Sequence, residues 1–150
     1  MTASLFTVRS ATTQDASAVS ELEQQCVLES KTYRGSEQLL SVVPLVGLDI
    51  DSYGTVAGHI VLVVESQSQL CGFAQMEIST SIALVRRVYV SQHARDLGAG
   101  ATLIEALRVR ARSEGCTQID AYALPGDRLT KNLFERAGMK ARLLIASSEL

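Results

Sequence analysis

The segment 95–101 carries residue types that can bind a phosphate group. Arg95 is followed three and five residues later by Gly98 and Gly100, and glycine lets a ligand approach the backbone closely. Apolar residues then recur at helical spacing, which predicts a helix from about 98 to 114. The first turn of a helix offers unpaired N–H groups and partial positive charge, and a guanidinium matches phosphate geometry. The spacing predicts an anion site, with a plain flexible helix start as the alternative.

A dinucleotide-binding turn is a second interpretation of the same glycines. Its G-x-G-x-x-G pattern would need a third glycine at position 103, where the chain has Leu103. That pattern also normally follows the first strand of its domain, whereas this turn follows a series of strands. The sequence therefore disfavours a nucleotide-dependent oxidoreductase.

The elements that must position this turn follow from hydrophobic periodicity, caps and breakers. In chain order we expect a strand at 5–11, a helix at 15–29 capped by Thr12 or Thr13, a short helix ended by Pro44, a loop at 45–58, strands at 59–66, 70–79 and 81–90, the helix at 98–114, a strand at 117–124, a helix at 127–136 and a final strand at 140–147. The three adjacent strands predict an antiparallel meander. The order predicts one α+β domain over 1–150, an α/β sandwich whose mixed, mostly antiparallel central sheet is flanked by helices on both faces.

Composition narrows the class of protein. The 150 residues are 47% hydrophobic and 20% charged, with a net charge of −2; these values indicate a globular protein and give no basic footprint for nucleic acid. Three widely spaced cysteines predict neither a disulfide framework nor a paired metal site, and no apolar run reaches membrane length. We therefore expect a cytoplasmic protein with no metal and no nucleic-acid or membrane partner.

The turn at 95–101 and a later segment at 127–139 resemble two motifs of the GNAT (Gcn5-related) N-acyltransferase family, in a poorly characterised bacterial branch. The family pattern (R/Q)-x-x-G-x-(G/A) is similar to Arg95, Gly98 and Gly100, with Leu103 and Ile104 at the family's paired aliphatic positions. The later pattern N-x-x-A-x-x-L-Y-x-K-x-G-F is similar to DRLTKNLFERAGM, residues 127–139. The resemblance extends over nearly the whole chain, and it implies acetyl-CoA or another acyl-CoA as co-substrate.

The resemblance also implies where the co-substrate lies. Strands 81–90 and 117–124 are expected to diverge, with pantetheine in the gap and backbone amides near Val88 and Val90 polarising the thioester carbonyl. Asp127 replaces the family's asparagine near the pantetheine. The residues expected at acyl-CoA are Val88, Tyr89, Val90, Arg95, Asp96, Leu97, Gly98, Ala99, Gly100, Ala101, Asp127 and Phe134.

Acyl transfer to an amine requires a base and an acid, and the family's usual groups are replaced here. Phe134 stands where the family often has a tyrosine acid, and core packing is its favoured role. Arg86 and Arg87 stand where many relatives have a glutamate base; they form a solvated pair or an edge-strand guard, or clamp an acceptor carboxylate. Glu77 is the best remaining carboxylate, with a solvated strand position as the alternative, and Tyr89 is either an acid or a packing residue.

Two functions remain open. The first is an N-acetyltransferase that passes an acetyl group to a primary amine of a small molecule or peptide. The second is a catalytically silent acyl-CoA-binding or regulatory module. The resemblance places Tyr33, Arg34 and Gly35 over the acceptor pocket, where they bind substrate or only form a turn. A homodimer is an open alternative to a monomer.

Overall fold

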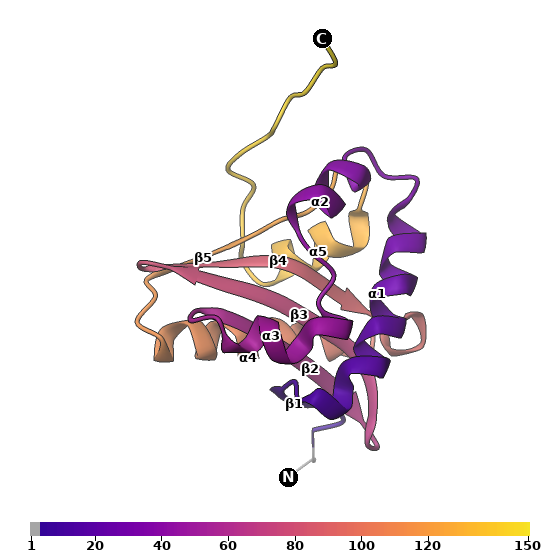
Figure 1. The fold of residues 1–150 in the computed structure, drawn as a ribbon, viewed down its shortest axis with the longest axis vertical. Helices are drawn as coiled ribbons and strands as arrows, with labels where there is room; N and C mark the ends of the chain where they lie inside the picture. Colours follow the sequence, from indigo (N-terminus) through magenta and orange to yellow (C-terminus); the bar gives the residue numbers. More distant parts are fainter. Residues whose placement is uncertain (1–3) are drawn as a thin grey trace.

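The computed structural model describes residues 4–150 and is an α+β fold with helices on both faces of one sheet (Figure 1). The elements are β1 Thr7–Ser10, α1 Ala16–Ser30, α2 Ser36–Val42, α3 Ile50–Thr55, β2 His59–Ser66, β3 Gln69–Ser79, β4 Ile82–Val90, α4 Ala99–Ser113, β5 Gln118–Ala121 and α5 Arg128–Arg136. The five strands lie in chain order. β1 to β4 are antiparallel and β5 is parallel to β4, so the predicted meander and mixed sheet are confirmed.

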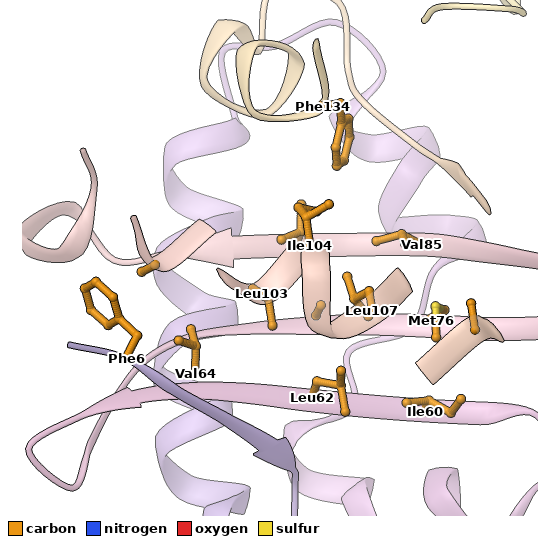
Figure 2. Close-up of a cluster of buried hydrophobic side chains, with 14 of the residues drawn as sticks. Phe6, Ile60, Leu62, Val64, Met76, Val85, Leu103, Ile104, Leu107 and Phe134 are labelled. Carbon is orange, nitrogen blue, oxygen red and sulfur yellow. The ribbon is translucent and has the colours of Figure 1, made fainter. Parts of the chain in front are cut away.

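Two apolar cores cover the two faces of the sheet. On one face α4 buries Leu103, Ile104 and Leu107, and Phe134 of α5 packs into the same cluster (Figure 2). On the other face Val19 of α1 and other buried side chains pack against β2, β3 and β4. Helical spacing gives α4 this apolar face. Successive side chains of a strand point to opposite faces of the sheet, so each strand contributes to both cores. The ends of β4 and α4 are thereby fixed relative to each other.

The structure overturns two predictions about elements. Residues 45–58 are not a loop throughout, because α3 and a 3-10 turn at Gly47–Asp49 lie within them. Ile50 and Tyr53 are three residues apart and both buried, so α3 docks by a short apolar stripe among polar and glycine residues. The segment 140–147 is not a strand, because it has no partner strand in the described chain.

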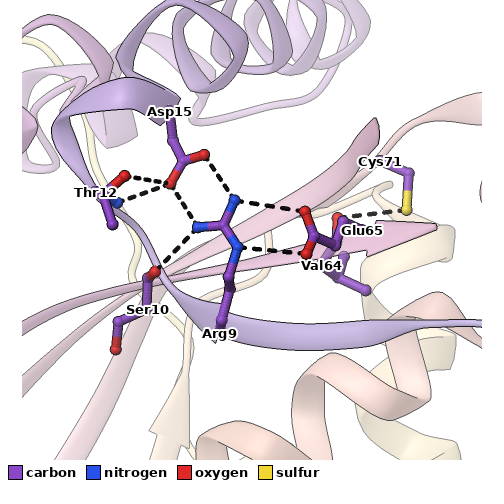
Figure 3. Close-up of polar contacts among 7 residues, drawn as sticks. All are labelled: Arg9, Ser10, Thr12, Asp15, Val64, Glu65 and Cys71. Carbon is purple, nitrogen blue, oxygen red and sulfur yellow. Dashed lines mark hydrogen bonds and ion pairs between the residues drawn. The ribbon is translucent and has the colours of Figure 1, made fainter. Parts of the chain in front are cut away.

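An ion-pair network joins β1 to the start of the first helix (Figure 3). The Arg9 guanidinium donates to both Asp15 oxygens, at 2.7 and 2.8 Å, and to Glu65 of β2 at 3.4 Å. The Asp15 carboxylate also accepts from the backbone N–H of Thr12 at 2.7 Å. The hydrogen bond from Arg9 is the main reason that the pKa of Asp15 falls to about 2. The network holds α1 against the edge of the sheet.

We expect Asp15→Asn to lower the free energy of unfolding by about 1 to 3 kcal/mol at pH 7, because it removes a buried charged acceptor. The lower end allows for the partial exposure of Arg9. A carboxyl whose pKa is depressed in the folded state stabilises the fold above its unfolded pKa of about 3.9, and this contribution is lost as pH falls towards 2. Urea unfolding at pH 7 and pH 3 measures both effects. A difference between variant and wild type that does not shrink at pH 3 contradicts the assignment.

Candidate active site

β4 and β5 separate halfway along β4. Their pairing runs from Ile82↔Gln118 to Val85↔Ala121, and the Tyr122 N–H then donates to the Val85 carbonyl at 3.0 Å. β5 ends at Ala121, whereas β4 continues to Val90. The last five residues of β4 therefore have no β5 partner on that edge.

Backbone groups of β4 point into this opening. The Ser91 N–H donates to the Cys71 carbonyl of β3 at 2.7 Å, and alternate residues of an antiparallel pair turn their N–H and C=O towards and away from the partner strand. By this alternation Tyr89 faces β3, and the N–H and C=O of Val88 and Val90 face the open edge. The Val90 carbonyl is taken by Arg95 Nε at 2.9 Å.

A β-bulge marks the point of divergence. Gln75 pairs with Arg87 and the next residue, Met76, pairs with Val85, so Arg86 is an extra residue in β4. Arg86 forms an ion pair with Glu77 at 2.7 Å. Arg87 is buried and donates to two carbonyls that follow α2, those of Val43 and Pro44, both at 3.2 Å. Neither arginine matches the solvated interpretation, since both have fixed partners inside the domain.

The turn before α4 has the backbone shape of an anion site. Asp96 and Gly98 both have positive φ, at 63° and 98°, and α4 begins directly after them at Ala99 with no side-chain cap on its first turn. The amides of this turn are thus not used by a capping side chain. Leu97 and Ala101 flank the turn and are exposed.

The two glycines of the turn have different structural roles. Gly98 is left-handed, a conformation that L side chains rarely adopt, and a Cβ there would meet no atom within 4 Å. Gly100 is different, because a Cβ would lie 2.9 Å from a methyl group of Leu133 in α5. Gly100 therefore permits close packing of α4 on α5, a use that the sequence motif did not reveal.

Arg95 ties the turn to the rest of the domain. Besides its bond to Val90, its guanidinium pairs with Glu29 of α1 at 2.5 Å and lies 5.5 Å from the centre of the Tyr89 ring. Sequence reasoning offered Arg95 as a phosphate partner but could not show Glu29, which is 66 residues away. Arg95 therefore orders the loop between β4 and α4.

Tyr89 points to the α1 side of the sheet. Its hydroxyl donates to Glu29 at 2.8 Å, and its ring belongs to the apolar core against α1. Burial, and then the neighbouring Glu29, raise the pKa of the Tyr89 phenol above its ordinary value. Its packing role is thus observed, and its role as an acid stays a prediction.

A polar hollow of about 430 Å³ lies between α1 and the end of β4, beside the Tyr89 hydroxyl. None of residues 95–101 lines it. The polar side chains in its wall are Glu21, Gln25, Glu29, Tyr89, Ser91, Gln92 and His93. Of these residues the sequence analysis selected Tyr89 alone, because α1 and the residues after β4 are far apart in the chain.

Glu77 is the centre of a polar cluster on β3. Tyr53 of α3 donates to one of its oxygens at 3.0 Å, and Arg86 donates to the other at 2.7 Å. His59 lies 3.8 Å from the same carboxylate and stacks on Tyr53, with ring centres 4.4 Å apart. The side chain of Glu77 is only 21% exposed, so the alternative of a solvated strand position does not describe it. Tyr53 was missed because it lies in the segment expected to be loop.

Two further residues of the predicted site are held by α5. Asp127 caps this helix by accepting from the Thr130 N–H at 3.1 Å. Phe134 is 7% exposed and lies in the core beside Ile104 (Figure 2), which confirms the packing role expected for it.

In residues 4–150 no group of three or more His, Cys, Asp or Glu side chains could hold a metal ion. No helix in the same span is long and apolar enough to cross a membrane.

Comparison with known proteins finds a sequence relative and solved structures of similar fold. An uncharacterized N-acetyltransferase of Bacillus subtilis (strain 168), YhfO, is 25% identical over 137 residues, which are 87% of each chain. The aminoglycoside acetyltransferase AAC(6')-Iy, solved with a bisubstrate analog of CoA, superposes with a TM-score of 0.72 at 14% identity, over 98% of this chain and 100% of that one. Glucosamine-6-phosphate N-acetyltransferase from Arabidopsis thaliana superposes with a TM-score of 0.68 at 15% identity, over 96% and 97%.

A model of the acetyltransferase (GNAT) domain matches residues 57–140, more than half of the chain. The matched span begins just before β2 and ends after α5. It contains the meander, the turn before α4 and the divergence of β4 from β5. The chain therefore belongs to the GNAT acetyltransferase family.

Proposed function

We propose that this protein is an N-acetyltransferase that transfers the acetyl group of acetyl-CoA to a primary amine of a small molecule or peptide. The observation that carries the proposal is that two features follow each other along the chain. They are the open edge of β4 at Val88 and Val90, and the uncapped first turn of α4. The first offers backbone donors to a thioester and amide chain, and the second offers amides to a pyrophosphate. The relatives that act on aminoglycosides and on glucosamine 6-phosphate support an amine acceptor.

Each end of acyl-CoA has its own set of contacts in this proposal. The amides at 96–101 hold the pyrophosphate at the positive end of the helix. The backbone of Val88 and Val90 holds the pantetheine and polarises the thioester carbonyl. Asp127 and Phe134 border the site from α5. Asp127 does so at the N-terminus of α5, which its side chain caps, and Phe134 does so where it lies next to α4.

The chemistry requires one bond to form and one to break. The amine nitrogen attacks the carbonyl carbon, the C–S bond breaks, and the proton of the amine leaves while the thiolate gains a proton. In our proposal Glu77, the partly exposed carboxylate beside the bulge, takes the proton of the amine. Tyr89 is the candidate donor to the thiolate, and water is the alternative because Glu29 engages the phenol.

A silent acyl-CoA-binding module is the second candidate. The observation that favours it is the replacement of the family's tyrosine acid by Phe134, a core residue with no proton to donate. Correct placement of a reactive thioester beside an amine carries much of the rate even without an acid. We therefore keep the enzyme as the first proposal.

The proposal is tested by following thiol release from acetyl-CoA in the presence of a panel of amines. The panel holds aminoglycosides, amino sugar phosphates, polyamines and peptides with a free N-terminus. At least one amine is expected to release thiol well above the rate without protein. If no amine in the panel gives thiol release although acetyl-CoA binds tightly, the result would support the binding module instead.

Binding itself is expected to raise the melting temperature. A ligand that binds only the native state at a hundred times its Kd adds about 2.7 kcal/mol of stability, which is a shift of roughly 5 to 10 °C for a domain of this size. Differential scanning fluorimetry with acetyl-CoA measures the shift, and pantetheine, which lacks the pyrophosphate, is the control and should shift the melting temperature less. Equal shifts of the melting temperature with both ligands would show that the turn before α4 does not contribute to binding.

A further inference from the structure

Two oppositely charged side chains are buried in the domain and have no part in the chemistry described so far. Glu23 of α1 is 2% exposed and Arg87 of β4 is 6% exposed. Burial raises the pKa of Glu23 and lowers the pKa of Arg87, because each charge is hydrated better in water. A buried charge is costly unless hydrogen bonds satisfy it. Both side chains therefore need partners inside the domain.

The partners of Glu23 are two neighbouring backbone amides. One carboxylate oxygen accepts from the Val46 N–H and the other from the Gly47 N–H, both at 2.7 Å. A Cβ on Gly47 would lie 2.4 Å from the Ser20 hydroxyl oxygen and 2.7 Å from the Glu23 carboxylate. Glycine has no Cβ and leaves room for this approach, so the backbone at Gly47 lies directly against α1.

The partners of Arg87 lie on the same stretch of backbone. Its guanidinium donates to the carbonyls of Val43 and Pro44, each at 3.2 Å. Hydrogen bonds to a charged group are stronger than neutral ones, and the guanidinium fork holds two acceptors in fixed positions. Segment 43–47 joins α2 to the turn before α3 (Figure 1). We call its four hydrogen bonds to Glu23 and Arg87 the 43–47 clamp.

The clamped segment leads directly into α3. The 3-10 turn Gly47–Asp49 is followed at once by α3, which begins at Ile50. Val46, Ile50 and Tyr53 belong to one buried apolar cluster. α3 has only six residues, and helices shorter than about 12 residues are marginal on their own. The position of α3 therefore depends on how the chain before it is anchored.

Tyr53 of α3 in turn holds the proposed base. Its hydroxyl donates to one oxygen of Glu77 at 3.0 Å, while Arg86 donates to the other at 2.7 Å. Arg86 belongs to the sheet itself, whereas Tyr53 reaches Glu77 from a separate helix. A misplacement of about 1 Å can cost about a hundredfold in rate. The rate should therefore respond to whatever fixes α3.

We propose that Glu23 and Arg87 are positioning residues: through the 43–47 clamp they hold the Tyr53 hydroxyl on Glu77 and so keep this carboxylate in place for the proton of the amine. The inference rests on the role proposed for Glu77. A buried charge pair seldom adds net stability, since the lost hydration offsets the attraction. Its effect here is to fix one backbone segment at a precise place.

Thiol release with the best amine of the panel tests the clamp. Glu23→Gln keeps the shape of the side chain but turns an N–H towards one of the two amides. It is expected to lower kcat by about ten- to a hundredfold, with the Kd for acetyl-CoA nearly unchanged. The matched control is Glu21→Gln, which changes an exposed glutamate of the same helix and should leave kcat within about twofold. Full activity of Glu23→Gln overturns the proposal.

A double-mutant cycle separates positioning from a general loss of structure. Tyr53→Phe removes the hydroxyl and should lower kcat at least as much as Glu23→Gln does. If the clamp acts through this hydroxyl, adding Glu23→Gln to Tyr53→Phe should cost less than about twofold more. Losses that multiply in the double variant overturn the proposal, because Glu23 would then act on the site by another route.

Arg87→Lys tests the other half of the clamp. Lysine keeps the charge, but an ammonium on a flexible stem does not hold two carbonyls as the guanidinium fork does. The loss of kcat should be smaller than in Glu23→Gln and should also vanish on the background of Tyr53→Phe. A loss that persists there contradicts the proposal, and this variant decides the question alone if Glu23→Gln does not fold.

Nuclear magnetic resonance tests the same geometry without turnover. The Val46 and Gly47 amides should exchange with deuterium at least about tenfold faster in Glu23→Gln than in the wild type. The Tyr53 ring stacks on His59 with ring centres 4.4 Å apart, so its resonances should shift in the same variant. Unchanged Tyr53 resonances overturn the proposal even if the amides exchange faster. A wild type that releases no thiol with any amine would refute the proposed function, whereas shifted Tyr53 resonances would still support the clamp.

Discussion

Glu77→Gln is expected to lower kcat/KM by about a hundredfold to ten-thousandfold, the usual cost of losing a general base. Glutamine keeps the size of the side chain and can still accept from Tyr53, but it cannot take the proton of the amine. Because Glu77 lies on β3 and its hydrogen bonds and ion pairs are with Tyr53, Arg86 and His59, none of them in 95–101, the Kd for acetyl-CoA should stay nearly unchanged. Thiol-release kinetics with the best amine of the panel, and calorimetric titration with acetyl-CoA, measure the two quantities.

Glu65→Gln is the matched control for this experiment. Glu65 lies on β2, is 22% exposed against 21% for Glu77, and also pairs with an arginine, Arg9. Its loss should change stability slightly and leave kcat/KM within a factor of about two, since a partly exposed ion pair contributes about 0 to 1 kcal/mol. A similar loss of rate in both variants would mean that the effect comes from a disturbed sheet structure and not from the loss of proton transfer.

Tyr89→Phe separates the remaining candidate from Glu77. The Tyr89 hydroxyl donates to Glu29, so its removal leaves Glu29 with Arg95 as its partner and preserves the ring in the core. If Glu77→Gln keeps near-full activity across pH while Tyr89→Phe loses it, the central role passes from Glu77 to Tyr89.

The parts of the fold that could be predicted are those with a local signal. The apolar spacing of Leu103, Ile104 and Leu107 defined α4, and β-branched runs defined the meander. α3 was missed because its apolar stripe consists of only two buried residues, and polar and glycine residues on either side are typical of a loop. The strand at 140–147 was predicted from composition, but a strand exists only where a partner strand pairs with it, and among residues 4–150 no strand pairs with this segment.

The candidate site shows the same division. The spacing of Arg95, Gly98 and Gly100 identified the turn before α4, because this geometry is encoded within six residues. Contacts between distant segments had no signal: Glu29 with Tyr89 and Arg95, and Tyr53 with Glu77. The bulge at Arg86 was equally hidden, since it arises from the register between two strands and not from any residue pattern in one of them.

The double change Leu97→Glu and Ala101→Glu is expected to weaken acetyl-CoA binding by roughly 10-fold to 3000-fold. Both side chains are exposed and flank the turn, so two carboxylates would stand near the pyrophosphate without filling any packed space. At about 7 Å and an effective dielectric constant of 20 to 80, each like-charge contact costs about 0.6 to 2.4 kcal/mol. Gly98 is a poorer position for this test, because any side chain there is also strained by its φ of 98°.

The matched control is Leu97→Gln with Ala101→Gln, which has the same shape without the charge. It should bind acetyl-CoA within a few-fold of the wild type. A glutamate in the first turn of α4 also favours the helix dipole, so weaker binding by the charged variant cannot come from loss of the helix. The difference between the two double variants should shrink as salt is raised, because ions screen exposed charges over about 8 Å at physiological strength. If calorimetry finds equal Kd values for both variants at low salt, the pyrophosphate does not lie at this turn.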